Sequence, residues 1–187
     1  TDPEMIYEER SGDAESYTVT DLDVGEYYYF YIVAYCGGAS GDNVAGERSD
    51  IDSCSVKPVT PDDLTATNES YNSIYLSWSP VDGADGYEIY YSYSSACVYR
   101  LVRIDDSGTT EYIHENMTQG KRYYYKIRSY SIVNGDTYLY SEFSSAINIY
   151  TRPAAPTNLV AGNSTTSGKP RISWDAAEGA TKYVVYY

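Results

Sequence analysis

Apolar and polar residues alternate most regularly in residues 73–91. Ile74, Leu76 and Trp78 are separated from one another by single residues, so the pattern predicts a strand with one apolar face. A proline and two glycines interrupt the run, and a second alternating segment begins at Tyr87. The stretch therefore predicts two strands joined by a turn.

The same pattern returns in residues 170–187. Trp78 corresponds to Trp174 and Tyr87 to Tyr183, in both cases 96 positions later. A pattern that recurs at a fixed spacing is typical of tandem copies of one structural unit. We therefore expect more than one copy of the same domain in this chain.

Alternating segments also fill most of the remaining chain, and no long stretch has the 3.6-residue apolar period of a helix. Asn134-Gly135 is a strong hairpin signal between two such segments. The chain is therefore expected to be all-β. The expected strands cover residues 16–19, 27–35 (one continuous strand), 51–56, 64–67, 73–79, 86–93, 99–104, 110–114, 122–133, 137–140 and 146–150, and residues 153–187 repeat the first three strands of the middle segment.

Two proline-containing segments, 58–61 and 152–156, predict linkers. They divide the chain into residues 1–57, 58–152 and 153–187. Short strands at regular spacing, with turn signals between them, favour a β-sandwich. We therefore expect sandwiches arranged in series along the chain.

The middle segment carries the motifs of a known family. Its strand Ile74–Trp78, the run GADGYEIY from Gly83 and the run YYYKI from Tyr123 resemble a fibronectin type III domain, in the style of secreted bacterial proteins. The resemblance implies tandem seven-stranded fibronectin type III-like β-sandwiches, one complete and two partial. These would be the C-terminal part of one domain in residues 1–57, a complete domain in residues 58–152 and the N-terminal part of another in residues 153–187.

The resemblance also implies a role for two tyrosines. Tyr28 and Tyr123 occupy the position of the family's tyrosine corner, where the hydroxyl binds a nearby backbone group. Before Tyr123, the segment Met117–Gly120 replaces the family's usual turn. The corner of the middle domain is therefore expected to be looser.

Strand alternation predicts the core of the middle segment, because alternate residues of a strand face the same side. The expected core residues are Leu64, Ile74, Leu76, Trp78, Tyr87, Ile89, Tyr123, Tyr125, Ile127, Ile147 and Ile149.

Composition argues against several classes of function. The net charge of −14 is unfavourable for nucleic-acid binding, which needs a basic surface. The most apolar run, residues 27–35, is far shorter than the roughly 20 residues of a membrane-spanning helix, so no membrane insertion is expected. The acidic composition fits the surface of an extracellular or cell-surface protein.

The cysteines and the histidine predict little chemistry. Three cysteines are too few and too scattered for a disulfide framework. Strand parity predicts Cys54 as a buried thiol, whereas Cys36 and Cys97 lie near domain poles where a disulfide between two copies is one alternative. His114, the only histidine, is expected at the surface without a catalytic partner, so no enzyme activity is expected.

Four acidic residues are expected near one domain junction. Asp21 and Asp23 precede the Tyr28 strand, and Asp62 and Asp63 begin the next domain. Carboxylate oxygens are the ligands that Ca²⁺ prefers. The sequence thus predicts either a calcium site at this junction or a solvated acidic loop, and no other cofactor.

Tyrosine is abundant, with 25 residues against 2 phenylalanines, and it is concentrated in residues 27–35. Parity along this segment predicts an unusually apolar outer face, and such faces often mark contacts. The interpretations are protein–protein packing, lateral in a fibre, stacking of glycans on the rings, or ordinary sheet surface. The residues of this expected face are Tyr29, Tyr31, Val33, Tyr35 and, from the partner strand, Val184 and Tyr186.

Two functions fit this sequence. The first is a structural module of a secreted or cell-surface tandem-repeat protein. In it, residues 153–187 of one copy complete residues 1–57 of the next, which gives a head-to-tail filament or one long repeated polypeptide. The other interpretation of the two incomplete ends is a fragment in which both are disordered. The alternative is an adhesin or carbohydrate-associated module that binds surface glycans through the tyrosine face. The expected partners are therefore other copies, head to tail and laterally, or glycans.

Overall fold

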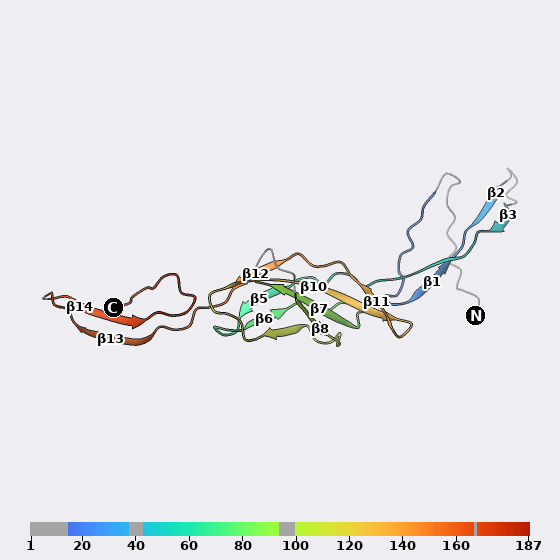
Figure 1. Ribbon diagram of the computed structural model, residues 1–187. Coiled ribbons are helices and arrows are strands. Elements are labelled where there is room, and N and C mark those ends of the chain that lie inside the picture. Colours follow the sequence, from blue (N-terminus) through green and yellow to red (C-terminus); the bar gives the residue numbers. More distant parts are fainter. Residues whose placement is uncertain (1–14, 38–42, 94–99, 167) are drawn as a thin grey trace.

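The computed structural model describes residues 15–37, 43–93, 100–166 and 168–187. These residues form strands β1 to β14 and no helix, as the all-β prediction expected. Figure 1 shows an elongated arrangement, with β1 to β4 at one end, β5 to β12 in the middle and β13 and β14 at the other end.

The middle part consists of two antiparallel sheets packed face to face. One sheet has the order β5-β6-β9, and the other has the order β11-β10-β7-β8, with β12 also paired to β10. The strands are β5 (Thr65–Asn68), β6 (Ile74–Ser77), β7 (Gly86–Ser92), β8 (Arg100–Ile104), β9 (Glu111–His114), β10 (Arg122–Val133), β11 (Thr137–Tyr140) and β12 (Ile147–Tyr150).

The core lies between these two sheets and matches most of the predicted list. Eight of the expected residues are buried, and Leu64, Ile147 and Ile149 are half-buried and pack against them. Val81, Ala84 and Met117 also belong to the core, although they lie in turns outside the strands. The eight buried residues are Ile74, Leu76, Trp78, Tyr87, Ile89, Tyr123, Tyr125 and Ile127.

The N-terminal part differs from the predicted single strand over residues 27–35. It has β1 (Tyr27–Phe30) paired with β4 (Asp52–Ser55), and β2 (Val33–Gly37) paired with β3 (Asn43–Arg48). The equivalent β10 is continuous because β7 pairs along its other edge. β1 and β2 have no such neighbour among the described residues, so the strand breaks between them. Residues 16–19 form no strand either.

The C-terminal part contains β13 (Thr157–Asn163) paired with β14 (Pro170–Asp175). The third predicted strand of this part, which includes Tyr183–Tyr187, is not formed. Its counterpart β7 lies between β8 and β10, and the described residues offer this segment no equivalent neighbours.

The strand registers of both outer parts repeat those of the middle part. In the N-terminal part Tyr27 faces Ser55, and in the middle part Arg122 faces Tyr150. Arg122 follows Tyr27 by 95 positions, and Tyr150 follows Ser55 by the same number. The pair β13–β14 likewise repeats the register of β5–β6, with offsets of 95 and 96. The outer parts are therefore built like halves of the middle domain.

The predicted burial of Cys54 is wrong. Cys54 faces Tyr28 across the β1–β4 pair, in the position of the half-buried Ile149. Its side chain is exposed and its thiol is free, because no second sheet covers this strand pair within the described residues.

Candidate interaction surfaces

Both expected tyrosine corners are formed. The hydroxyl of Tyr28 accepts a hydrogen bond from the backbone N–H of Asp23 at 2.9 Å. The hydroxyl of Tyr123 accepts one from the N–H of Thr118 at 3.0 Å. The two lengths are nearly equal, so the unusual turn before Tyr123 does not prevent the corner bond, and the expectation of a looser middle corner stays a prediction.

The turns that precede the strands of Tyr28 and Tyr123 each contact the next part of the chain. A β-carbon on Gly83 would lie 2.6 Å from the Cβ of Val24, which leaves room only for a glycine. At the other junction a β-carbon on Gly179 would lie 2.6 Å from the Cα of Gly120. Both Gly83 and Gly179 also have positive φ, of 71° and 76°. Turns at equivalent positions of the repeat therefore meet at both junctions.

The tryptophan that marks the repeat has the same surroundings in both copies. The ring centroids of Trp78 and Tyr87 are 5.3 Å apart, as are those of Trp174 and Tyr183. The Tyr87 hydroxyl accepts a hydrogen bond from the N–H of Val81, and the Tyr183 hydroxyl accepts one from the equivalent residue of its own turn. The repeat seen in the sequence is thus also a repeat of geometry.

The outer parts expose large apolar side chains, one of which has a fully buried counterpart in the middle domain. Ile32 is 76% exposed, whereas its counterpart Ile127 is fully buried. Leu159 and Val160 on β13 are also exposed, and Tyr186 is 90% exposed. These faces are apolar surfaces without a covering layer in the described residues.

The residues of the predicted tyrosine face lie in two separate parts of the chain. Tyr29 and Tyr35 are exposed on β1 and β2, and the Tyr27 and Tyr29 ring centroids lie 5.6 Å apart. Val184 and Tyr186 are exposed as well, but they follow β14 at the opposite end of the chain (Figure 1). One chain therefore does not bring the two halves of this face together.

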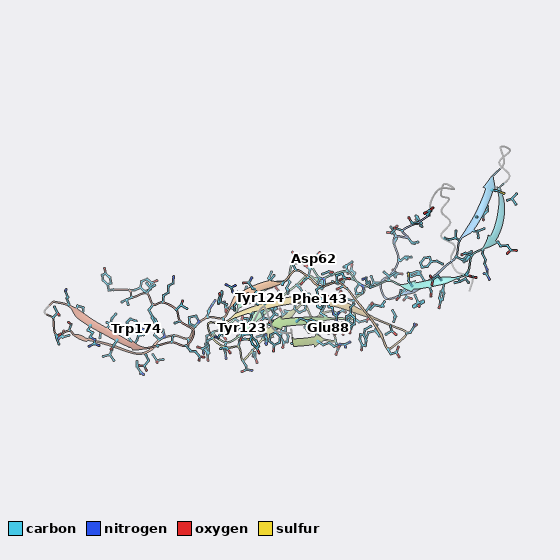
Figure 2. The ribbon with its side chains drawn as sticks, turned by 45° about the horizontal axis from the view of Figure 1, so that its top comes forward. Asp62, Glu88, Tyr123, Tyr124, Phe143 and Trp174 are labelled. Carbon is cyan, nitrogen blue, oxygen red and sulfur yellow. The ribbon has the colours of Figure 1, made fainter. Side chains whose placement is uncertain are left out.

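The equivalent face of the middle domain is closed by paired charges and rings. Arg128 donates two hydrogen bonds to one oxygen of Glu88, at 2.8 and 2.6 Å, and Glu88 is only 2% exposed. The Arg128 guanidinium lies 3.7 Å from the ring centroid of Tyr140. The Lys126 Nζ lies equally close to the ring centroid of Phe143. Figure 2 shows Glu88 and Phe143 in the body of this domain, far from Trp174.

Beside this closed face, Arg103 packs against two tyrosine rings. Its guanidinium carbon is 4.5 Å from the ring centroid of Tyr130 and 4.2 Å from that of Tyr138. The Tyr130 hydroxyl donates a 2.6 Å hydrogen bond to Asp105, and this bond, together with Arg103, lowers the pKa of that carboxyl. Burial raises the pKa of Tyr130 to about 12.

His114 is half-buried rather than exposed at the surface as expected. Its Nδ1 lies 3.1 Å from the Tyr125 hydroxyl, and its ring packs edge-on against Tyr91 with centroids 4.2 Å apart. Burial among these rings lowers its pKa, because the charged imidazolium loses its hydration. Period-2 alternation shows which face a strand residue takes, but not how closely aromatic neighbours cover it.

The four aspartates are not gathered into one cluster. In the described part of the chain, no three or more His, Cys, Asp or Glu residues are placed to hold a metal ion. Asp21 accepts a hydrogen bond from the hydroxyl of Thr20, and Asp63 accepts one from that of Ser79. Asp62 and Asp63 line a shallow hollow with Phe143. The calcium site stays a prediction, and an unchanged melting temperature in excess Ca²⁺ would remove it.

The proposed disulfide partners can be placed only in part. The thiol of Cys36 is free and exposed on β2. Cys97 lies outside the described residues, so the bridge between copies stays a prediction.

No helix among the described residues is long and apolar enough to cross a membrane.

Two antiparallel sheets packed around a shared core define the middle part as a β-sandwich. The family model of the fibronectin type III domain matches residues 59–144. The sequence resemblance is therefore confirmed for the middle part, whose residues 59–144 match the fibronectin type III domain.

A curated relative and several solved structures are also similar to this chain. An amylopullulanase of Thermoanaerobacterium saccharolyticum is 34% identical over 108 residues, which cover 58% of this chain but only 8% of that protein. A Fn3-like protein from Clostridium thermocellum is 26% identical, with 49% of this chain and 90% of that chain covered and a TM-score of 0.41. The FN1–FN3 domains of chicken CNTN1 are 19% identical, with 70% and 44% covered and a TM-score of 0.47.

Proposed function

We propose that this chain is a non-catalytic structural module of a secreted or cell-surface protein, in which fibronectin type III units follow one another at a fixed orientation. The observation that carries the proposal is the repeated junction. The Gly83 turn meets Val24, and the Gly179 turn meets Gly120, through equivalent turns. Units that dock through one repeated contact give a regular array with a constant step.

The linkers support this role because both make hydrogen bonds with the middle domain. Ser129 donates a hydrogen bond to the carbonyl of Val59 at 2.6 Å, and Pro61 is buried. At the second linker, the N–H of Ala154 donates to the side-chain oxygen of Gln119 at 3.2 Å. Short proline-containing linkers held in this way restrict bending between units.

The spacer role is tested by substituting one junction glycine. Gly83→Ala places a methyl group against Val24, so we expect the junction to open and the maximum dimension measured by small-angle X-ray scattering to change. Gly135→Ala is the matched control, because Gly135 also has positive φ, of 83°, but has nothing within 4 Å of the added methyl. Equal scattering curves for the two variants would contradict a fixed junction.

The similarity to an amylopullulanase favours an accessory position within a larger extracellular protein. The name of that relative also supplies a second candidate function, a carbohydrate-associated or adhesive module. The exposed Tyr27 and Tyr29 rings are the observation that favours it, since aromatic faces can stack on sugars. Retarded migration in gels that contain pullulan, lost in Tyr29→Ala, would support this role, and unretarded migration would exclude it for that polysaccharide.

A further inference from the structure

The charges of the middle domain are sorted between its two sheets. The strands of the larger sheet, β7, β8, β10, β11 and β12, contain five lysines and arginines but only one acidic residue, Glu88. The strands of the smaller sheet, β5, β6 and β9, contain one acidic residue, Glu111, and no lysine or arginine. Residues 58–93 and 105–120, which include the smaller sheet and its turns, contain no lysine or arginine either. The five cationic residues are Arg100, Arg103, Arg122, Lys126 and Arg128.

Most of these cations lie on the outer face of the larger sheet, which we call the basic face. Along β10, Lys126 and Arg128 alternate with buried core residues, so their side chains point away from the core. Glu88 stands opposite Arg128 on one neighbouring strand and opposite Arg103 on the other, so all three share this side. Four cations share the face with two carboxylates, which leaves it positive in a chain with a net charge of −14. The charged residues of the basic face are Arg103, Arg122, Lys126 and Arg128, with Glu88 and Asp105.

Aromatic rings hold the cations of the basic face in place. The guanidinium carbon of Arg122 lies 4.6 Å from the ring centroid of Tyr150, and its Nη1 donates a hydrogen bond to the Tyr124 hydroxyl at 3.4 Å. Within the described residues Arg122 has no carboxylate at ion-pair distance. Side chains that are fixed before binding lose little conformational entropy when a partner docks. The basic face is therefore positioned to receive negative charge.

The outer face of the smaller sheet, which we call the acidic face, has the opposite character. Glu111 and Ile113 are exposed on β9, and Tyr75 of β6 lies directly beside Ile113. The Tyr75 hydroxyl donates a hydrogen bond of 2.6 Å to Glu111. Glu69, which follows β5, is exposed as well, and its charge acts on the Tyr75 hydroxyl. The acidic face thus presents carboxylates around an exposed isoleucine.

We propose that the basic face of one copy docks on the acidic face of a second copy, so that chains associate laterally. Charge complementarity selects this occupant, because the acidic face supplies carboxylates where the basic face has an excess of cations. Two basic faces or two acidic faces would repel each other. Apolar groups add to the contact, since Ile113 on one face and Tyr150 on the other are both exposed. The contact uses only residues of the middle domain and is separate from the fixed junctions proposed above.

The two faces lie on opposite sides of the sandwich, because the sheets pack against each other through their inner faces. One copy therefore cannot cover its own basic face. Each copy offers both faces, and a contact between two different faces can be repeated from copy to copy. The net charge of −14 opposes this contact at long range, but at an ionic strength of about 0.15 M charges are screened beyond about 8 Å. The complementary charges at the contact then outweigh the net repulsion.

The test uses the whole 187-residue chain and sedimentation velocity at about 0.15 M salt over a range of concentrations. We expect the unmodified chain to sediment faster as concentration rises. Arg122→Glu on the basic face and Glu111→Lys on the acidic face should each weaken self-association at least about tenfold, because each places like charges opposite one another. An equimolar mixture of the two variants should associate again, but only to dimers, because it retains one intact face of each kind.

Lys57→Glu is the matched control, because it makes the same change in charge as Arg122→Glu at an exposed position outside both faces. A concentration-independent unmodified chain, self-association of Arg122→Glu equal to that of Lys57→Glu, or a mixture that stays monomeric would each overturn the proposal. The scattering test of Gly83→Ala on the Arg122→Glu background reports the junction separately, so failure of either idea is distinguishable.

Discussion

Arg128 binds Glu88 through two nitrogens that converge on one carboxylate oxygen, and the pair is enclosed between neighbouring strands and the Tyr140 ring. Glu88 alternates along β7 with the core residues Tyr87 and Ile89, and yet its side chain is among the most deeply buried of the domain. The charges are thus part of the packing of this face.

Glu88→Ala should lower the free energy of unfolding by about 3 kcal/mol or more, because it leaves the Arg128 cation without its partner in a covered site. Urea denaturation measures the loss. The paired replacement Glu88→Val with Arg128→Val should recover most of it, since an apolar pair of similar shape often replaces a buried ion pair without cost.

The surface pair of Lys57 and Glu142 is the control for this prediction. Its side chains are 60% and 86% exposed, and Glu142→Ala should change the free energy of unfolding by less than about 1 kcal/mol. Equal losses for Glu88→Ala and Glu142→Ala would show that the buried position does not matter.

The two tryptophans should differ in what they stabilise. Trp78 is 5% exposed inside the closed sandwich, so Trp78→Ala should cost about 3–5 kcal/mol and unfold much of the middle domain. Trp174 makes the same ring contact with its tyrosine, but its strand pair carries no second sheet in the described residues. Trp174→Ala should therefore leave the main urea transition of a monomeric chain nearly unchanged, and a comparable loss for the two variants would contradict this.

Strand alternation was sufficient for the middle domain because both faces of each strand have defined surroundings there. It gave the strand ranges and the central core residues, such as Ile74, Tyr125 and Ile127. It missed Val81 and Met117, since residues in turns follow no period of two. Their burial depends on how the turns fold over the ends of the sheets.

Sequence reasoning failed where a strand needs a neighbour that the described chain does not supply. The Tyr27–Tyr35 segment was predicted as one continuous strand like β10, yet it breaks because no strand of the described residues lies where β7 lies in the middle domain. Cys54 is exposed for a related reason, the missing second layer. The contact of Gly120 with Gly179 had only a weak signal, the recurrence of glycine in equivalent turns.

The tyrosine corner should contribute measurably to stability. Tyr123→Phe removes the hydroxyl that accepts the N–H of Thr118, and it should cost about 0.5–1.5 kcal/mol because a partly buried hydrogen bond is lost. Tyr150→Phe is the matched control, since Tyr150 is exposed and its ring can still pack under Arg122. Indistinguishable urea midpoints for the two variants would mean that the Tyr123 bond is not stabilising.

The chain should lose stability in mildly acidic solution through His114. Its pKa in the folded protein lies below the ordinary value of 6.5 because the ring is covered by Tyr91, Tyr123 and Tyr125. The unfolded chain therefore binds a proton at a higher pH than the folded chain does. The stabilisation is complete above about pH 6.5 and declines as the pH falls towards the folded-state pKa.

Melting temperatures between pH 7.5 and pH 5 measure this effect. The decline over this range should become shallower in His114→Gln, which retains a polar side chain for the Tyr125 hydroxyl but does not titrate. Asp105, whose pKa is lowered by Tyr130 and Arg103, contributes a separate loss only at lower pH, where carboxylates bind protons. If His114→Gln and the unmodified chain show the same slope from pH 7.5 to pH 5, protonation of His114 does not set the acid stability of this domain.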